Sequence, residues 1–123
     1  MRPIFEAGEN IAIKVPAHEY DQTVSFYQDI LGLERKNAKS TDEYHTAVFK
    51  FGDKNLWVDR ISSMSQAEIW LEIRTDNAEH AATYLDQCKV SRCDDIERLP
   101  EGFKGIWISG PSNIVHLITE KVE

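Results

Sequence analysis

The sequence has few cysteines, no long apolar run and no excess of basic residues. Its two cysteines, Cys88 and Cys93, stand five residues apart. That spacing differs from the Cys-x-x-Cys pattern of redox motifs and zinc ribbons. We therefore expect both thiols to be reduced and to carry no chemistry.

Acidic side chains outnumber basic ones, since the chain has 21 Asp and Glu but only 14 Lys and Arg, which gives a net charge of −7. Such a charge repels phosphate backbones, so we expect neither nucleic acid nor an anionic membrane as a partner. No apolar run approaches the roughly 20 residues that a membrane span needs. Acidic residues within 1–9 occupy the place of a signal peptide's apolar centre, so we predict a cytoplasmic protein.

What the sequence does contain is an apolar strand followed by an amphipathic helix. In residues 10–15 apolar and mixed positions alternate, which predicts a strand with one face against a helix. The helix is predicted over residues 22–32, and Gly32 supplies a left-handed stop. The apolar face of the strand carries Ile11, Ile13 and Val15, its other face carries Asn10, Ala12 and Lys14, and the helical stripe is Tyr20, Val24, Tyr27 and Leu31.

The second half of the chain repeats this order. A strand over residues 69–74 is followed by a helix whose predicted start is a capping box of Asp76 and Glu79. The apolar stripe of that helix is predicted to contain Ala78, Ala81, Leu85 and Cys88. Further strands are predicted at 34–40, 45–51, 56–61, 90–97, 103–109 and 114–119, with turns at 41–43, 52–55 and 110–113.

This layout is an internal duplication of a strand, a helix and three strands. We expect one domain over residues 1–123, built from one module at about 9–61 and a second at about 67–121. A chain of about 55 residues buries only about 60% of the surface that it exposes when unfolded. The two modules should therefore stabilise each other.

The run Phe26-Tyr27-Gln28-Asp29-Ile30-Leu31-Gly32 after an apolar strand resembles the first helix of the vicinal oxygen chelate superfamily. That superfamily includes glyoxalase I, extradiol dioxygenases, fosfomycin-resistance enzymes and bleomycin-resistance proteins. The resemblance implies an α+β fold in which two tandem βαβββ modules form a curled mixed sheet around a trough, the active site of the superfamily. It also implies a homodimer. The turn at 110–113 is similar to the Asp-Pro-x-Gly turn before the superfamily's last strand, but differs at its first and fourth positions.

If the apolar strand faces contact the helices, the opposite faces line the trough. Alternation then places polar and aromatic side chains there. With the single histidine of the last strand, the predicted ligand-binding residues are Asn10, Lys14, Trp57, Asp59, Trp70, Glu72, Arg74, Trp107 and His116.

Metal-dependent members of the superfamily carry ligands at four places, which fall here at or near Asn10, Trp70, Val58 or Asp59, and His116. Only His116 is a good donor, because an indole has no free lone pair for a metal. We therefore predict no metal and no cofactor. The alternative is an irregular site on which Asp59, Glu72 and His116 converge.

The resulting hypothesis is a metal-independent protein that binds a small planar organic molecule, as the resemblance to bleomycin-resistance proteins implies. Flat indoles with a few fixed charges favour a cationic or neutral aromatic ligand. The alternative function is a glyoxalase-type lyase or dioxygenase that uses a metal. A third is a small interaction or assembly module whose trough is filled. Two alternatives also stay open for the residues themselves: the three tryptophans as plain core, and Glu72 with Arg74 as an ordinary ion pair.

Overall fold

A computed structural model describes residues 1–37 and 45–121. The turn predicted at 41–43 and the end of the strand predicted at 34–40 lie outside these ranges. Within them the chain has seven strands and the helices α1 and α2, which is the predicted α+β composition. It forms two compact units, one of residues 9–70 and one of residues 1–8 with 71–123. No helix in the described ranges has the length and apolarity to span a membrane.

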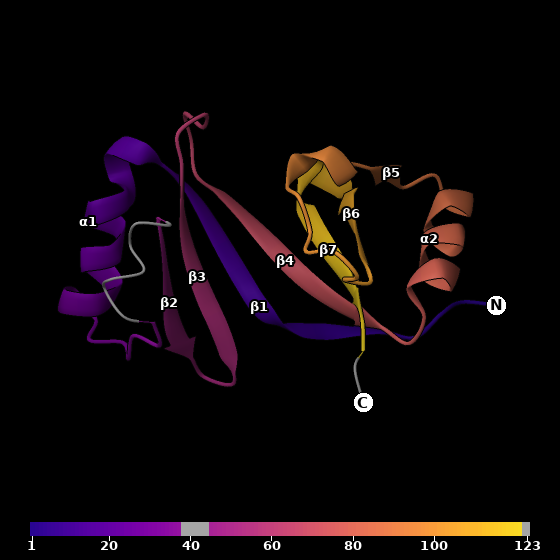
Figure 1. Ribbon diagram of the computed structural model, residues 1–123, viewed down its shortest axis with the longest axis horizontal. Helices are drawn as coiled ribbons and strands as arrows, with labels where there is room; N and C mark the ends of the chain where they lie inside the picture. The colour runs from indigo at the N-terminus through magenta and orange to yellow at the C-terminus, as the bar shows by residue number, and fades with distance from the viewer. Residues whose placement is uncertain (38–44, 122–123) are drawn as a thin grey trace. The chain divides into compact units, whose positions relative to one another are not determined.

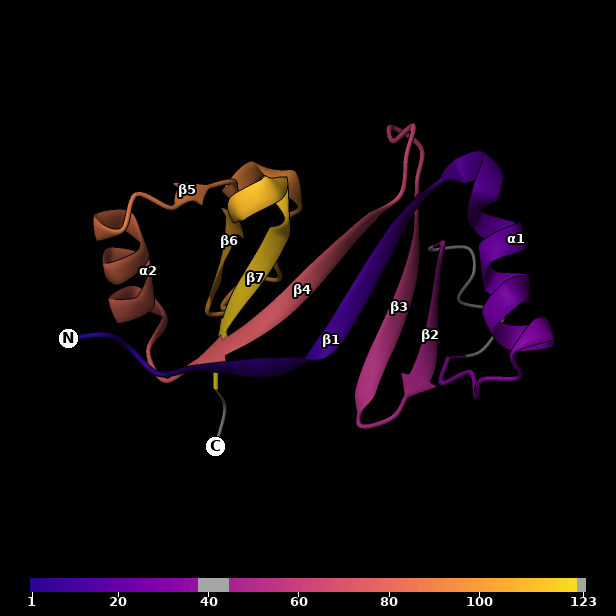
Figure 2. The same cartoon turned by 180° about the vertical axis from the view of Figure 1, so that it is seen from behind.

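The 9–70 unit contains most of β1 (Phe5–Pro16), followed by β2 (Thr46–Phe51) and β3 (Lys54–Ile61). β3 lies between the other two, parallel to β1 and antiparallel to β2, as Figures 1 and 2 show. A turn joins β2 and β3 within the predicted 52–55, but it is only two residues long because β3 begins at Lys54, and Gly52 in it has a φ of 65°. Of the strand predicted at 34–40, Arg35 forms only an isolated bridge to Phe49.

The first helix differs from the prediction in its second half. A 3₁₀ turn (Ala17–Glu19) leads into α1 (Tyr20–Ser25), and a π-helical turn (Phe26–Ile30) follows. In this wider turn the Leu31 N–H donates to the Phe26 carbonyl, five residues back, at 3.0 Å. The extra residue shifts the apolar stripe, so that Leu31 is 52% exposed and Leu33 packs on the core in its place. The predicted burial of Leu31 is therefore wrong.

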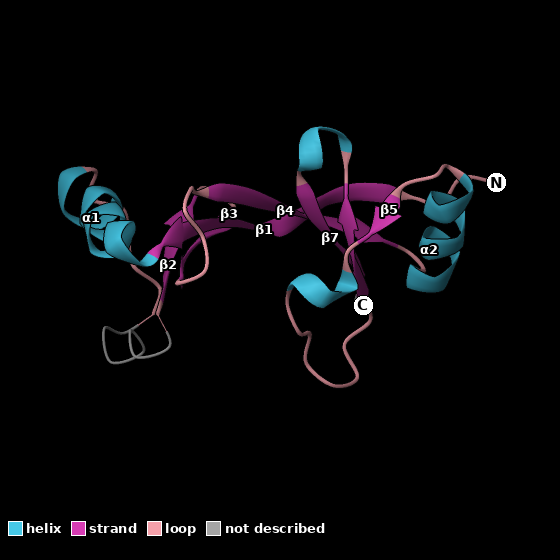
Figure 3. Ribbon diagram, turned by 90° about the horizontal axis from the view of Figure 1, so that it is seen from above, coloured by secondary structure: helices cyan, strands magenta, loops and turns pink. Residues whose placement is uncertain are grey.

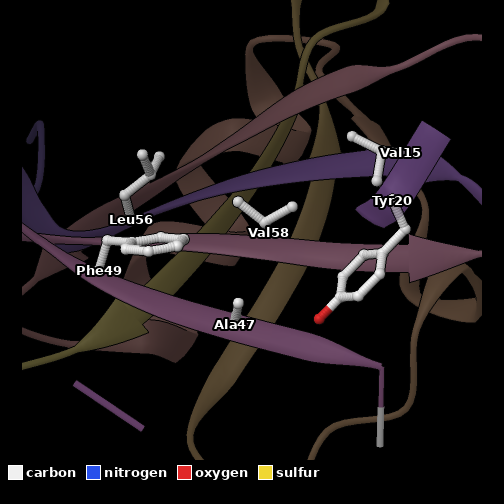
Figure 4. Packing of buried hydrophobic residues seen from close by; sticks show 6 residues of the cluster. All are labelled: Val15, Tyr20, Ala47, Phe49, Leu56 and Val58. Carbon is white, nitrogen blue, oxygen red and sulfur yellow. The ribbon is translucent and has the colours of Figure 1, made fainter. Parts of the chain in front are cut away.

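The core of this unit lies between α1 and one face of the strands. Its buried residues are shown in Figure 4, where Tyr20 projects from the helix toward the side chains of β1, β2 and β3. Ile11 and Ile13 pack against the same cluster, as the alternation in β1 predicts. The cluster consists of Val15, Tyr20, Ala47, Phe49, Leu56 and Val58.

The second unit repeats the pairing pattern of the first. β4 (Glu68–Thr75) runs parallel to β7 (Val115–Glu120) from Leu71 onward, and β6 (Gly105–Ser109) is antiparallel to β7. The short β5 (Ser91–Arg92) pairs with the far side of β6, and the order is β4-β7-β6-β5. Figure 3 shows α2 (Ala78–Gln87) alongside β5, and α1 of the other unit alongside β2.

Several details of this unit correct the sequence prediction. Asn77, rather than Asp76, caps α2, since its side chain accepts the His80 N–H at 2.9 Å. Cys88 is exposed because it follows the last residue of the helix. The strand predicted at 90–97 is only two residues long, because a 3₁₀ turn (Asp94–Ile96) interrupts it. Ile69, expected on the core side of β4, is exposed.

The core of the second unit includes the beginning of the chain. Phe5 of β1 packs against a cluster centred on Ala81 and Ile118, and its ring lies 6.1 Å from that of Tyr84. The Ile4 N–H donates to Asp76, and Lys121 pairs with Glu6 at 3.2 Å. These contacts bind residues 1–8 to the C-terminal half of the chain.

Candidate ligand-binding site

The face of the 9–70 unit that points away from α1 carries the polar side chains of β1 and β3. Paired residues of neighbouring strands share a face, and the register aligns Asn10 with Asn55 and Lys14 with Asp59. Their neighbours in sequence, including Ile13 and Val58, belong to the core on the other side. We call the polar face the set Asn10, Lys14, Asn55, Trp57, Asp59 and Trp70.

At one end of the polar face an ammonium group is enclosed by a carboxylate and an indole. Lys14 Nζ lies 2.7 Å from Asp59 Oδ2 and 4.3 Å from the centre of the Trp70 ring. The Lys14 side chain is only 3% exposed and Trp70 is 4% exposed. A charge so far out of water requires a partner, and this one has a carboxylate and an aromatic face.

The Asp59 carboxylate and the Trp70 ring are themselves held in place. The Thr46 hydroxyl donates to Oδ1 of Asp59, whereas Lys14 donates to Oδ2. The indole N–H of Trp70 donates to Glu68 Oε1 at 3.0 Å. The carboxylate and the ring are therefore both oriented by a second contact, which reduces the freedom that a bound molecule would have to remove.

A hydrogen-bonded network joins the side chains at the other end of the polar face. The Asn10 carbonyl oxygen accepts the Trp57 indole N–H at 2.8 Å and the Asn55 amide at 3.1 Å. Lys36 Nζ donates to the Asn55 side-chain oxygen. Trp57 is only partly buried, so part of its indole stays exposed while its N–H is held by Asn10. The network therefore fixes the orientation of this ring.

The other predicted site residues lie in the second unit. Glu72 stands beside Leu117 and Arg74 beside Thr119, on the side of β4 opposite the Ile73 that packs under α2. Glu72 also lies against Gly8, where an added Cβ would stand 2.5 Å from its Cγ.

Trp107 is buried and fixed within its own unit. Its indole N–H donates to the Glu97 carbonyl at 2.9 Å, and its backbone N–H donates to Asp94 at 3.0 Å. Both acceptors belong to the segment after β5. These contacts fix the orientation of the Trp107 indole within its own unit.

His116 lies on the α2 side of its sheet. It pairs with Ile108 of β6, a residue of the core cluster under α2, and with Leu71 of β4. Its Nδ1 lies 2.9 Å from the Ile114 carbonyl, to which a ring nitrogen can only donate. Glu72 pairs with Leu117, the next residue of β7, so Glu72 and His116 lie on opposite faces of their sheet.

The four positions that the resemblance assigns to metal ligands do not fit a divalent metal. Trp70 offers an N–H instead of a lone pair, and the Asn10 oxygen already accepts two donors. Asp59 is paired with an ammonium group. Of the four positions only His116 keeps a suitable donor atom, its Nε2, since its Nδ1 is held by the Ile114 carbonyl, and one ligand is too few for a divalent metal. Within residues 1–37 and 45–121, no three His, Cys, Asp or Glu side chains are grouped to hold a metal ion.

Sequence reasoning missed Thr46, Asn55 and Glu68, which orient the predicted residues. Thr46 could be found from the two-residue turn at Gly52 and Asp53. This turn fixes the β2–β3 register and so places Thr46 opposite Asp59. Asn55 follows in the same way from the parallel register of β1 and β3. The sequence gives no indication of the role of Glu68 beyond its position two residues before Trp70 on the same strand.

Comparison with known proteins identifies the fold. No protein-family model and no curated protein matches the sequence. Among solved structures, a hypothetical protein from Bacillus halodurans C-125 matches with a TM-score of 0.65 and 15% identity over 97% of this chain and 96% of that one. A glyoxalase/bleomycin resistance protein/dioxygenase superfamily member from Vibrio splendidus 12B01 matches with a TM-score of 0.60 and 11% identity, over 90% of this chain and 97% of that one.

A third match is the Mn(II)-bound glyoxalase from Novosphingobium aromaticivorans, with a TM-score of 0.64 and 14% identity. The alignment covers 95% of this chain but only 40% of that enzyme. The chain thus has the vicinal oxygen chelate fold, as its sequence predicts. At these identities the likeness shows the fold alone.

Proposed function

We propose that this chain, with the fold of glyoxalases, bleomycin-resistance proteins and extradiol dioxygenases, is a binding protein that holds a small planar organic molecule without a metal. The observation that supports this proposal is the arrangement of the polar face. Asn10 fixes Trp57 by one edge, and Lys14 is held between Asp59 and Trp70. Oriented polar groups beside an accessible aromatic surface are what small-molecule sites use to fix a ligand.

The energetics of such a site are adequate without a metal. Stacking on an indole contributes about 0.5 to 1.5 kcal/mol beyond the burial of apolar area. A ligand that buries most of its surface against Trp57, and accepts or donates a few hydrogen bonds, reaches roughly micromolar affinity. The positions that the superfamily uses for metal ligands support binding in preference to lyase or dioxygenase chemistry, because at three of the four, Asn10, Asp59 and Trp70, the side chain is of the wrong kind or already engaged.

The test is a titration of tryptophan fluorescence with planar anions, cations and neutral aromatics. We expect a saturable change in emission that Trp57→Ala and Asn10→Ala each reduce by about tenfold in affinity, or about 1.4 kcal/mol. Trp107→Phe is the matched control, because this indole is buried and bound to Glu97. Unchanged binding in both polar-face variants, or no binding at all, would reject the proposal.

A second series of titrations, with metal present, distinguishes this proposal from the enzymatic alternative. The protein is dialysed, and each ligand titration is repeated with Mn²⁺ present. The proposal predicts the same affinity in both series. A metal that is retained in stoichiometric amount, and that tightens ligand binding, would favour the lyase or dioxygenase.

A further inference from the structure

The enclosure of Lys14 has a consequence for what the polar face can accept. A carboxylate and the face of an indole are the two groups that recognise organic cations, the first by charge and the second by its ring quadrupole. Asp59 and Trp70 present both to one point, 2.7 Å and 4.3 Å from the Lys14 nitrogen. The point is shielded from water, since Lys14 is 3% exposed.

We propose that Asp59 and Trp70 form a cation slot which Lys14 fills from within, so that the polar face rejects organic cations and selects neutral or anionic planar molecules. This inference rests on the proposed function, whose ligand class it narrows. It replaces the preference for a cationic ligand that the three tryptophans and the net charge suggest from sequence.

The polar face rejects organic cations for two reasons, because the Lys14 ammonium group already occupies the slot and because it carries the same charge as the ligand. An incoming cation would have to displace a tethered ammonium group that has no entropy of association to lose, or else approach it against like-charge repulsion. Asp59 is in addition held by the Thr46 hydroxyl, which donates to its Oδ1. A neutral or anionic ligand meets neither penalty.

The slot is tested by emptying it and refilling it. Lys14→Ala removes three methylenes and the ammonium group, which together correspond to n-propylammonium. We expect this ion to raise the melting temperature of Lys14→Ala by about 2 to 4 °C at concentrations well above its dissociation constant, and to leave the parent protein unchanged. Neutral n-propanol is the matched control and should have no such effect. The double variant Lys14→Ala/Asp59→Asn should lose the response.

Selectivity is measured with three probes of one shape, namely 2-naphthoate, 2-naphthalenemethanol and a naphthyl-trimethylammonium ion. In the parent protein the neutral or anionic probe should bind at least about tenfold more tightly than the cation. Lys14→Met keeps the apolar stem and removes the charge, so it should narrow that ratio by about tenfold or more. If Lys14→Ala does not fold, the change in selectivity of Lys14→Met still shows whether the Lys14 charge excludes cations.

The outcomes separate the two proposals. If the parent protein binds the cationic probe as tightly as the neutral one, the inference fails while the binding function stands. If no probe binds the parent, the binding function fails, and n-propylammonium rescue alone decides whether the slot exists. A rescue that is absent, or that persists in the double variant, would overturn the slot.

Discussion

Glu72 lies against Gly8 so closely that residue 8 has no room for a side chain. An ideal Cβ on Gly8 would stand 2.5 Å from Cγ and 2.8 Å from Cβ of Glu72. Real Cβ atoms do not approach other carbons this closely, and the obstruction begins at the root of the glutamate side chain. The requirement for glycine in β1 is therefore steric, with no positive φ involved.

Gly8→Ala should destabilise the protein by about 1 to 3 kcal/mol, because the new methyl group forces β1 or Glu72 to move. Chemical denaturation measures the change in the free energy of unfolding. The same substitution made in a Glu72→Ala background should cost less, since part of the obstructing side chain is then absent. Equal costs in the two backgrounds would mean that Glu72 is not the obstacle.

Asp59→Ala should cost about 3 kcal/mol in the free energy of unfolding, because it leaves the Lys14 ammonium buried without its carboxylate. In a Lys14→Met background the same change should be much less costly, since no unpaired charge remains. Asp53→Ala, in the exposed turn of the same hairpin, is the control and should change stability by less than about 0.5 kcal/mol. Additive effects of the Lys14 and Asp59 substitutions would contradict the pairing.

Asn77→Ala should destabilise the second unit by about 1 kcal/mol, the usual cost of losing a helix cap. The side chain of Asn77 accepts the His80 N–H, and alanine leaves that donor without its partner. Glu79→Ala tests the capping box that the sequence suggests, and it should cost less than about 0.5 kcal/mol. If Glu79→Ala proved the more harmful of the two, the observed cap would be misassigned.

Glu120 should make stability depend on pH in the acidic range. The Ala78 N–H donates to its carboxylate at 3.0 Å and Lys104 lies 3.3 Å away, and the first of these contacts is the larger cause of its lowered pKa. A lowered pKa in the folded state stabilises the fold above the unfolded-state pKa, and this contribution disappears as the pH falls through the folded-state pKa. The difference in unfolding free energy between parent and Glu120→Gln should therefore shrink on acidification. Glu101→Gln, at an exposed turn, should show no such change.

The two thiols should differ in reactivity. Partial burial, and to a lesser extent the neighbouring Asp94 carboxylate, raise the pKa of Cys93, whereas Cys88 is exposed. Because the thiolate is the nucleophile, iodoacetamide should alkylate Cys88 first at pH 8. Peptide mapping by mass spectrometry gives the order, and Cys88→Ser should leave only the slow phase. Faster labelling at Cys93 would contradict the assignment.

The elements that the sequence predicts well are those in which one physical signal dominates. The alternation of Ile11, Ile13 and Val15 requires one face of β1 to be buried whatever the rest of the chain does. Gly32 ends the first helix with a φ of 68°, as its position implies. The π turn has no comparable signal, because a shift of one hydrogen bond at Phe26 leaves the composition of the helix unchanged.

The candidate site was only partly accessible to sequence reasoning, for a related reason. Period-two alternation assigns Asn10, Lys14, Trp57 and Asp59 to one face, and the strand pairing agrees. Alternation alone does not give the distances that make Lys14 the partner of Trp70, because those depend on how the strands twist and pack. The orientation of His116 likewise required the register of β7 against β6, since both faces of that strand are apolar in sequence.

The division of β1 between the two units affects the order in which the chain folds. Residues 1–8 leave the ribosome long before the residues with which they pack, which begin at Leu71. The 9–70 unit has all its strands and its helix once Trp70 has emerged, whereas the first eight residues must wait for the last strands to be synthesised. Closing so long a loop delays folding. We therefore expect a ribosome-bound chain of about 70 exposed residues to bury Tyr20 while leaving Phe5 accessible to protease.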